Sequence, residues 1–179
     1  LHIRKFTSKK EVMRTGMAHE IFRLINDAYA PLFGYSRMSE KQIDQYVKMY
    51  VPVLDLRMVT LIETADGQLV GVGISMPSLS AALRKCGGKL FPFGWWHLLR
   101  AIKGNSKVVD LLLVAVKPEY QSKGVNALIF NDLEPIYHQC GYEYAESNPE
   151  LELNENVQRQ WEYFEHTQHR RRRSWRRNL

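Results

Sequence analysis

Hydrophobic and polar positions along this chain follow two different periodicities, and the first is that of an α-helix. One set of apolar residues recurs every three or four positions, which is the spacing of a single buried helix face. Its members are Ile21, Ile25, Ala28 and Leu32. Thr7 or Ser8 stands where a helix cap is expected, so the pattern predicts one helix that ends near residue 30. Ser39 predicts the cap of a second helix that ends near Tyr50.

The second periodicity is that of strands separated by turns. Residues 2–6 alternate as a short first strand does. Two segments rich in Val, Ile, Leu and Met, 56–63 and 69–76, flank an Asp-Gly pair at 66–67, which tight hairpin turns prefer. Residues 107–116 are almost continuously apolar, which favours a central strand buried on both faces. Together these segments predict a sheet.

The last third of the chain predicts a helix, a strand and another helix. The first of these helices spans residues 124–139, and Pro135 inside it predicts a kink or an early stop. Its apolar stripe consists of Val125, Ile129, Leu133, Ile136 and Cys140. We expect a short strand over residues 142–145 and a helix over residues 154–164. Residues 169–177 form either a last strand or a tail.

The order of these elements predicts the fold class. Strand, two helices, hairpin, strand, helix, strand, helix and strand indicate a single α/β domain over residues 1–179, with a mixed central β-sheet flanked by α-helices. The connection over residues 77–106 is an atypical insertion. Three interpretations of its aromatic run at 90–99 stay open: a helix packed over the sheet edge, a lid or acceptor pocket, and a homodimer contact.

Charge argues against a nucleic-acid-binding body. The 179 residues are 45% hydrophobic, enough for a buried core, and the net charge is +6. Six arginines at the end supply all of this charge, so residues 1–169 balance to zero. These arginines are Arg170, Arg171, Arg172, Arg173, Arg176 and Arg177. Around Trp175 they could bind nucleic acid, but alternation along a charged edge strand is the reading we favour, so nucleic acid is not an expected partner.

Compartment and metal binding follow from simple counts. Charged residues interrupt any apolar run at the N-terminus, and no window approaches the ~18 apolar residues of a membrane helix, so we expect neither a signal peptide nor a membrane-spanning helix, and no membrane partner. Cys86 and Cys140 are expected to be free thiols in a reducing cytoplasm, so we expect a cytoplasmic protein. The histidines show no metal-binding spacing, so we expect no metal.

The corner after the apolar strand holds the candidate chemistry. It reads Pro118-Glu119-Tyr120-Gln121-Ser122-Lys123-Gly124-Val125-Asn126. A helix N-terminus leaves backbone N–H groups without partners and carries a partial positive charge, so it can bind phosphate where Gly124 permits close approach. Lys123 adds a cation, while Gln121 and Ser122 add hydrogen-bonding side chains. The glycine spacing of Walker and Rossmann loops is absent from the sequence.

This corner resembles the acetyl-CoA signature of the GNAT-type N-acetyltransferases. In that family an apolar strand leaves through Val-x-Pro, and Gln/Arg-x-x-Gly-x-Gly/Ala then opens a helix. Here the exit is Val116-Lys117-Pro118, and the turn runs from Gln121 to Asn126, with Asn126 in place of Gly or Ala. The resemblance implies a single-domain GNAT-like fold, acetyl-CoA as the cofactor, and acetyl transfer to an amine of a small-molecule or peptide acceptor.

The resemblance also implies roles for individual residues. The strand backbone at Val114 and Val116 would bond the pantetheine arm, and the amides of the corner would hold the pyrophosphate. The corner residues are Gln121, Ser122, Lys123, Gly124, Val125 and Asn126. A second family motif matches Asn154 and Trp161. Asn154 would bond the pantetheine, whereas Trp161 replaces the Tyr that protonates the departing thiolate.

Acetyl transfer also needs a group that takes a proton from the amine. Glu146, just after the expected strand 142–145, is the first candidate for this base, and Asp110, one strand over, is the second. A solvated strand-end carboxylate is the alternative reading of Glu146. Because the usual Tyr is lost, a catalytically inactive acyl-CoA-binding or protein-interaction module of the same fold is the alternative function.

Overall fold

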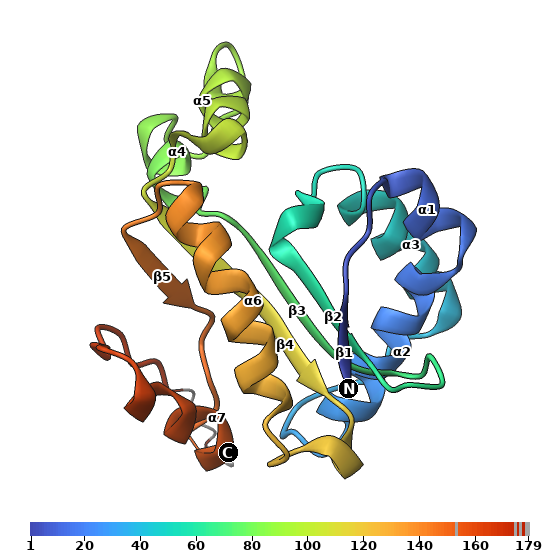
Figure 1. Ribbon diagram of the computed structural model, residues 1–179. Coiled ribbons are helices and arrows are strands. Elements are labelled where there is room, and N and C mark those ends of the chain that lie inside the picture. The colour runs from blue at the N-terminus through green and yellow to red at the C-terminus, as the bar shows by residue number, and fades with distance from the viewer. Residues whose placement is uncertain (153, 174, 176, 178–179) are drawn as a thin grey trace. The chain divides into compact units, whose positions relative to one another are not determined.

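The computed structural model describes residues 1–152, 154–173, 175 and 177 (Figure 1). The chain divides into residues 1–148, here called unit 1, and residues 149–179, called unit 2, and each is described by itself. Unit 1 contains a five-stranded sheet in the order β1-β2-β3-β4-β5. Its strands are β1 His2–Arg4, β2 Val59–Glu63, β3 Leu69–Pro77, β4 Val108–Val116 and β5 Tyr144–Ser147. The first four strands pair antiparallel and β5 pairs parallel to β4, so the mixed sheet is confirmed.

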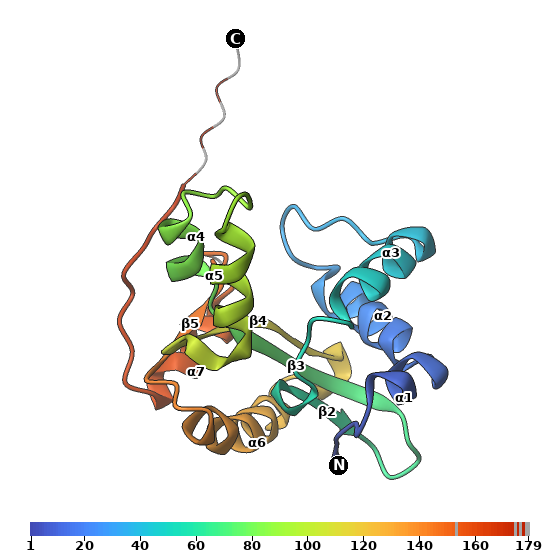
Figure 2. The same ribbon diagram turned by 90° about the horizontal axis from the view of Figure 1, so that it is seen from above.

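Helices cover both faces of this sheet. Helices α1 Lys9–Arg14, α2 Met17–Tyr29 and α3 Glu40–Tyr50 lie on one side, and α6 Val125–Gln139 lies on the other (Figure 2). The apolar faces of α2 and α3 pack on β2 and β3 through residues such as Ile43 and Leu61, both fully buried. On the opposite face α6 buries a smaller cluster against β3 and β4. The predicted α/β architecture is therefore correct.

The predicted single helix over residues 8–30 is wrong, because two helices occupy this segment. Gly16 has φ 71°, a left-handed conformation that ends α1 and begins α2. The predicted cap is present, since Ser8 Oγ accepts a hydrogen bond from the Glu11 N–H at 3.2 Å. The Glu11 carboxylate in turn accepts from the Thr7 N–H at 3.3 Å, so both candidate residues take part.

Two other local predictions need correction. The hairpin of β2 and β3 is confirmed, but residues 56–58 form a 3-10 turn instead of strand. Its loop is longer than a two-residue turn, because the Thr64 N–H donates to the Gln68 carbonyl at 3.0 Å. Helix α6 does not stop at Pro135 and continues to Gln139. Tertiary packing of the turns on either side of Pro135 offsets the hydrogen bond that proline removes.

Glycines in β3 let α6 lie directly on the sheet. A Cβ atom at Gly73 would be 2.3 Å from Ile129 Cγ2, and one at Gly71 would be 2.6 Å from Val125 Cγ1. Val125 and Ile129 are 1% and 0% exposed, so the predicted apolar stripe of α6 is the buried face. This close packing places the first turn of α6 beside the end of β4.

The insertion between β3 and β4 folds into two short helices. They are α4 Ser80–Lys85 and α5 Gly94–Arg100, and a π-helical turn over Ala101–Asn105 follows. Figure 1 shows them beyond one end of the sheet, and Figure 2 shows them on the side away from α6. In the part of the chain that the structure describes, no helix is both long and apolar enough to cross a bilayer.

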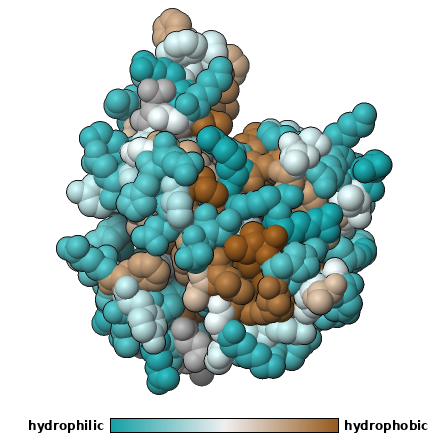
Figure 3. All heavy atoms as spheres, viewed as in Figure 1, coloured by the Kyte–Doolittle hydropathy of each residue, from teal (hydrophilic) through white to brown (hydrophobic). Residues whose placement is uncertain are grey.

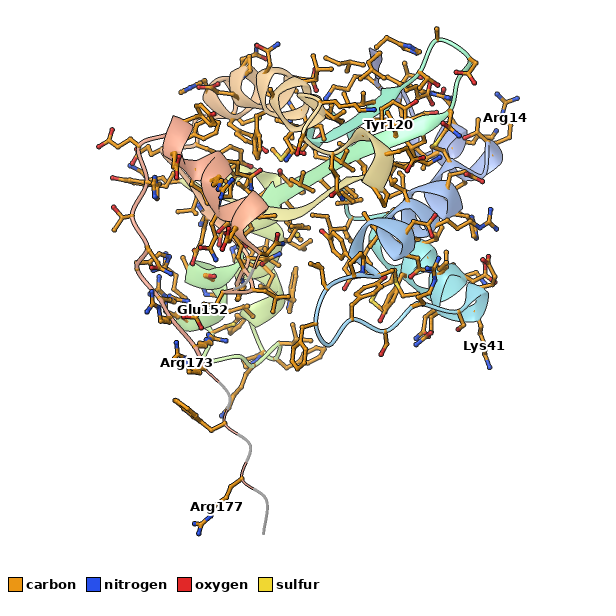
Figure 4. All side chains as sticks on the ribbon, turned by 90° about the horizontal axis from the view of Figure 1, so that it is seen from below. Arg14, Lys41, Tyr120, Glu152, Arg173 and Arg177 are labelled. Atoms are coloured by element: carbon orange, nitrogen blue, oxygen red, sulfur yellow. The ribbon has the colours of Figure 1, made fainter. Side chains whose placement is uncertain are left out.

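Unit 2 is mostly irregular in its described residues. Helix α7 spans Glu155–Gln160 and a 3-10 turn spans Trp161–Tyr163, close to the predicted helix over 154–164. No strand is assigned to residues 169–173, 175 and 177, whereas Ser174 and Arg176 lie outside the described residues. The choice between a last strand and a tail therefore stays a prediction. Figure 4 shows Arg173 near Glu152, with which it forms an ion pair at 2.8 Å.

Candidate functional site

The strands that flank β4 change near a β-bulge. Two successive residues of β3, Ile74 and Ser75, pair with Leu113 and Leu111. Leu112, between them, has no partner on β3 and is the extra residue of the bulge. Pairing with β5 ends one residue earlier, at Leu111. Within unit 1, β4 therefore has a strand beside it on one side only from Leu112 onwards.

The backbone groups of Val114 and Val116 point to this open side. The Lys117 N–H donates to the Val70 carbonyl at 2.9 Å, which sets the alternation of the β3–β4 ladder. In an antiparallel ladder every second residue turns its N–H and C=O away from the partner strand. Val114 and Val116 are those residues. The two positions that the sequence predicted for a pantetheine arm thus lie on an open strand edge.

Three side chains from three different elements donate to carbonyl oxygens of this edge. The bonds run from Asn148 Nδ2 to Leu112 (2.8 Å), from the Tyr29 hydroxyl to Val114 (3.0 Å) and from Gln121 Nε2 to Val116 (3.2 Å). Burial raises the pKa of Tyr29, so its hydroxyl stays protonated and donates. The carbonyls are thus satisfied by protein, and the N–H groups of Val114 and Val116 face the same side.

The expectation that β4 is buried on both faces holds only in part. Leu112, Leu113 and Val114 are half-buried, although the sequence around them is as apolar as the rest of the strand. Strand β5 ends at Ser147 and covers only the first part of β4. The apolar pattern could not distinguish a covered strand from one whose neighbour ends early.

Two left-handed residues shape the corner that follows β4. A 3-10 turn over Pro118–Tyr120 leads to Ser122 with φ 60° and Gly124 with φ 79°. A positive φ is uncommon for a residue other than glycine, so Ser122 is a strained position. A Cβ atom at Gly124 would have no atom within 4 Å, which means that its backbone faces open space. Figure 4 shows Tyr120 at this corner, and Lys123 Nζ lies 5.3 Å from the centre of its ring.

The first turn of α6 directs backbone N–H groups into this corner. The first helical hydrogen bond runs from the Leu128 N–H to the Gly124 carbonyl at 3.2 Å. The N–H groups of the three preceding residues, 125–127, therefore lack an intrahelical acceptor. The Val125 side chain is buried, so only its backbone is placed to meet a ligand. Asn126 is half-buried at the same turn.

The structure brings both candidate bases together. Asp110 and Glu146 are partners in the parallel β4–β5 register, one position before pairing ends. Val109 packs with Tyr142 and α6, so alternation directs Asp110 to the opposite face of the sheet. Burial raises the pKa of Asp110, a hydrogen bond with the Ser78 side chain opposes this shift, and the charge of Glu146 adds to it. Glu146 is half-buried.

The second motif lies in unit 2. Trp161 Nε1 donates to Glu150 Oε1 at 2.8 Å. Asn154 begins α7, and its carbonyl accepts from the Val157 N–H at 3.1 Å, without a hydrogen bond from its side chain to the helix. The assignment of Asn154 to the pantetheine arm therefore stays a prediction.

Sequence reasoning missed Tyr29 entirely. Its hydroxyl reaches β4 from the end of α2, 85 residues away along the chain. No motif or spacing marks it, because the contact depends on the packing of α2 on the sheet. Two surface hollows, of about 520 and 430 Å³, are lined by residues 5–7, 55–57, 136 and 139, and by residues around Arg23 and Ser39, so neither includes the corner. The candidate site is instead an open strand edge beside a helix end.

Comparison with known proteins shows the fold. The sequence matches no family model. It is 33% identical over 100 residues to a bacterial ceramide synthase of Caulobacter vibrioides, and this match covers 55% of the chain. The chain spans about a quarter of the length of that relative, since the match covers 26% of it.

Two solved acetyltransferases are similar along nearly the whole chain. The aminoglycoside N-acetyltransferase AAC(6')-Iy superposes with a TM-score of 0.57 at 14% identity, over 99% of this chain and 98% of that one. An aminoglycoside acetyltransferase from an uncultured soil metagenomic sample, solved with sisomicin, superposes with a TM-score of 0.54 at 9% identity. The match covers 99% of this chain and 95% of that one. The chain therefore has the fold of the GNAT-type acetyltransferases, as the corner sequence predicted.

Proposed function

We propose that this chain is an acetyl-CoA-dependent N-acyltransferase that transfers an acetyl group to an amine of a small-molecule or peptide acceptor. The observation that carries the proposal is the open edge of β4 after Leu112, which leads directly into the left-handed corner at Ser122 and Gly124. The similar protein AAC(6')-Iy was solved with a bisubstrate analogue of CoA, which supports the same use of this fold.

The chemistry of the cofactor fits the groups present. The pantetheine arm carries amide groups, whose oxygens would accept from the N–H groups of Val114 and Val116 as a neighbouring strand would. The pyrophosphate would accept from the amides of residues 121–126, with Lys123 adding a positive charge. The open space at Gly124 supports such an approach. Asn154 would contribute a further hydrogen bond to the pantetheine arm. Bound acetyl-CoA would supply the activated acyl group as a thioester.

Glu146 would take the proton from the acceptor amine. Its register partner Asp110 lies on the next strand, and the charge of Glu146 adds to the burial that raises the pKa of Asp110. Strand-edge N–H groups near Val114 would hydrogen-bond the thioester oxygen as negative charge develops there.

Cofactor binding is tested with Gly124→Glu and a matched control. Gly16 begins α2 with φ 71° and open space at its Cβ position, so Gly16→Glu imposes the same backbone strain far from the corner. We expect Gly124→Glu to weaken acetyl-CoA binding by about ten- to a hundredfold in calorimetry, because a carboxylate repels the pyrophosphate and blocks its hydrogen bonds. Gly16→Glu should bind as the unchanged chain does. Equal affinities of both folded variants would remove the phosphate-site argument.

A second candidate function is an inactive acyl-CoA-binding module. The observation that favours it is Trp161, since an indole N–H donates hydrogen bonds but does not release a proton near neutral pH. Release of free thiol from acetyl-CoA with a panel of amines separates the two functions. An enzyme releases thiol, and Glu146→Gln lowers the rate by about 10²–10⁴ without loss of binding. Binding with no thiol release by the unchanged chain would favour the module.

A further inference from the structure

The insertion between β3 and β4 exposes large apolar side chains at one end of unit 1. We call six of them the α4–α5 apolar cluster; they are Leu90, Phe91, Phe93, Trp95, Trp96 and Leu99. Their exposed fractions run from 43% for Leu99 to 81% for Phe91. In the space-filling view, brown and tan side chains reach the surface at this end (Figure 3). So much exposed apolar surface in one short segment indicates a contact surface.

The segment that carries the cluster is tightly folded. The Trp95 N–H donates to the Leu90 carbonyl at 3.0 Å, and Trp95 Nε1 donates to the Pro92 carbonyl at 3.0 Å. At Gly94 a Cβ atom would lie 1.8 Å from the Lys89 carbonyl oxygen, so the turn closes on itself and accepts only glycine there. Because both N–H groups of Trp95 are paired within the turn, its ring can enter an apolar phase beside Phe91 and Phe93 without leaving the indole N–H unsatisfied.

The charge of the insertion points to the chemistry of its partner. Residues 77–106 hold five cationic side chains and no Asp or Glu. The five are Arg84, Lys85, Lys89, Arg100 and Lys103. Since residues 1–169 balance to zero, all other residues of that range together carry a net charge of −5. Within unit 1 the insertion therefore carries a net charge of +5, whereas the other residues of that unit carry a net charge of −1.

Aromatic side chains in a segment that also carries three lysines fit an anionic lipid surface better than a protein partner. Protein interfaces are enriched in aromatic residues and arginine but depleted in lysine. The interfacial layer of a bilayer, in contrast, accommodates Trp and Phe, while anionic headgroups attract both Lys and Arg.

We propose that the α4–α5 apolar cluster docks on the surface of an anionic lipid bilayer. Phe91, Phe93 and Trp95 enter the layer between headgroups and acyl chains, and the cations of the insertion contact headgroup phosphates. The sequence led us to expect no membrane partner because no segment is long enough to span one, but surface docking needs no such segment. The proposal stands apart from the proposed acyltransferase activity, since lipid binding is measured without acyl-CoA.

The first experiment uses cosedimentation of the whole chain with vesicles. We compare phosphatidylcholine vesicles with vesicles of equal parts phosphatidylcholine and phosphatidylglycerol. The variant Phe91→Ser with Phe93→Ser is matched by Phe33→Ser, because Phe33 is 89% exposed in another loop of unit 1. We expect the chain to bind the anionic vesicles, the double variant to bind at least about tenfold more weakly, and Phe33→Ser to bind normally. A double variant that binds normally would overturn the proposal.

The second experiment separates local charge from total charge, with the arginine-rich end present in every protein. Lys85→Gln with Lys89→Gln removes two charges beside the cluster. Arg14→Gln with Lys41→Gln removes two from α1 and α3, where Figure 4 shows both side chains directed outward. We expect only the first pair to weaken binding to anionic vesicles. Equal losses would assign the binding to diffuse charge and contradict docking through α4 and α5.

Tryptophan fluorescence places the contact. The chain has four Trp residues, so Trp161→Phe with Trp175→Phe leaves Trp95 and Trp96 as reporters. We expect their emission to shift to the blue with anionic vesicles and to be quenched by brominated acyl chains. A homodimer contact is the competing outcome. Sedimentation could find a dimer that the variant Phe91→Ser with Phe93→Ser dissociates, while the emission of Trp95 and Trp96 does not change with vesicles. In that case the surface binds a second copy instead of lipid.

Discussion

The two halves of β4 have similar apolar sequences but different surroundings. Val109–Leu111 pairs with β3 on one side and with β5 on the other, whereas, in the part of the chain that the structure describes, Leu113–Val116 pairs with β3 alone. In the second half, side chains of Tyr29 and Gln121 take the place of a neighbouring strand at two carbonyls. The first half is therefore ordinary sheet interior. The second half keeps N–H groups facing outward, and this difference makes it the candidate site.

The largest expected effect comes from pushing α6 away from the second half. Gly73 pairs with Val114, and Gly73→Val would force its side chain into Ile129 of α6. We expect the free energy of unfolding to fall by about 3 kcal/mol in urea titrations, because an overpacked core cannot accommodate the added atoms. Met76→Val, on the same strand opposite the first half, is the control and should change little. Equal stabilities of the two variants would contradict the packing of α6 on β3.

Matched valine truncations compare the two halves directly. Val109 in the first half is 0% exposed, whereas Val114 in the second half is half-buried. We expect Val109→Ala to lower the free energy of unfolding by about 2 kcal/mol and Val114→Ala by less than about 1 kcal/mol. Urea titration of both variants measures the difference. A Val114→Ala variant as unstable as Val109→Ala would show that the second half is buried like the first.

Removing the hydroxyl that caps Val114 should have a smaller effect. Tyr29→Phe leaves the Val114 carbonyl without its donor and should cost about 1 kcal/mol. Tyr35→Phe is the control, because Tyr35 donates to Asn26 at 2.7 Å and not to β4. In amide hydrogen exchange, only Tyr29→Phe should speed exchange in residues 113–116. Equal exchange in both variants would mean that Tyr29 does not stabilise this edge.

The smallest expected effect is a dependence of the melting temperature on pH, which arises from Asp110 in the first half of β4. Burial raises the pKa of Asp110 above its ordinary value of 3.8, so the folded state favours the protonated carboxyl. The resulting stabilisation is present below pH 3.8 and is lost as the pH rises through the raised pKa. We therefore expect Asp110→Asn to melt at a higher temperature than the unchanged chain near neutral pH, with the difference vanishing in acid. In a background of Glu146→Gln, the melting difference between Asp110→Asn and its parent should be smaller near neutral pH, since the charge of Glu146 contributes to the raised pKa of Asp110. A melting difference independent of pH would assign the effect to packing.

Local signals in the sequence predicted much of the fold. The cap at Ser8, the β2–β3 hairpin and the stripe of α6 were predictable because each depends on residues a few positions apart. Gly16 was missed as a break, since a glycine is tolerated inside a helical pattern and only the packing of α1 and α2 shows that the chain turns there. The aromatic run at 90–99 left three interpretations open, namely a helix packed over the sheet edge, a lid or acceptor pocket, and a homodimer contact.

For the candidate site, the sequence by itself determined the corner from Gln121 to Asn126, because a strand exit, a left-handed glycine and a helix start are local chemistry. Only the tertiary structure decided that β4 is open beside this corner. The bulge at Leu112 depends on pairing with β3, and directly after β5 ends Asn148 bonds to Leu112 across 36 positions of the chain. Such long-range contacts form only when the packed sheet repays the entropy of closing the intervening loop, and no pattern of neighbouring residues encodes their register.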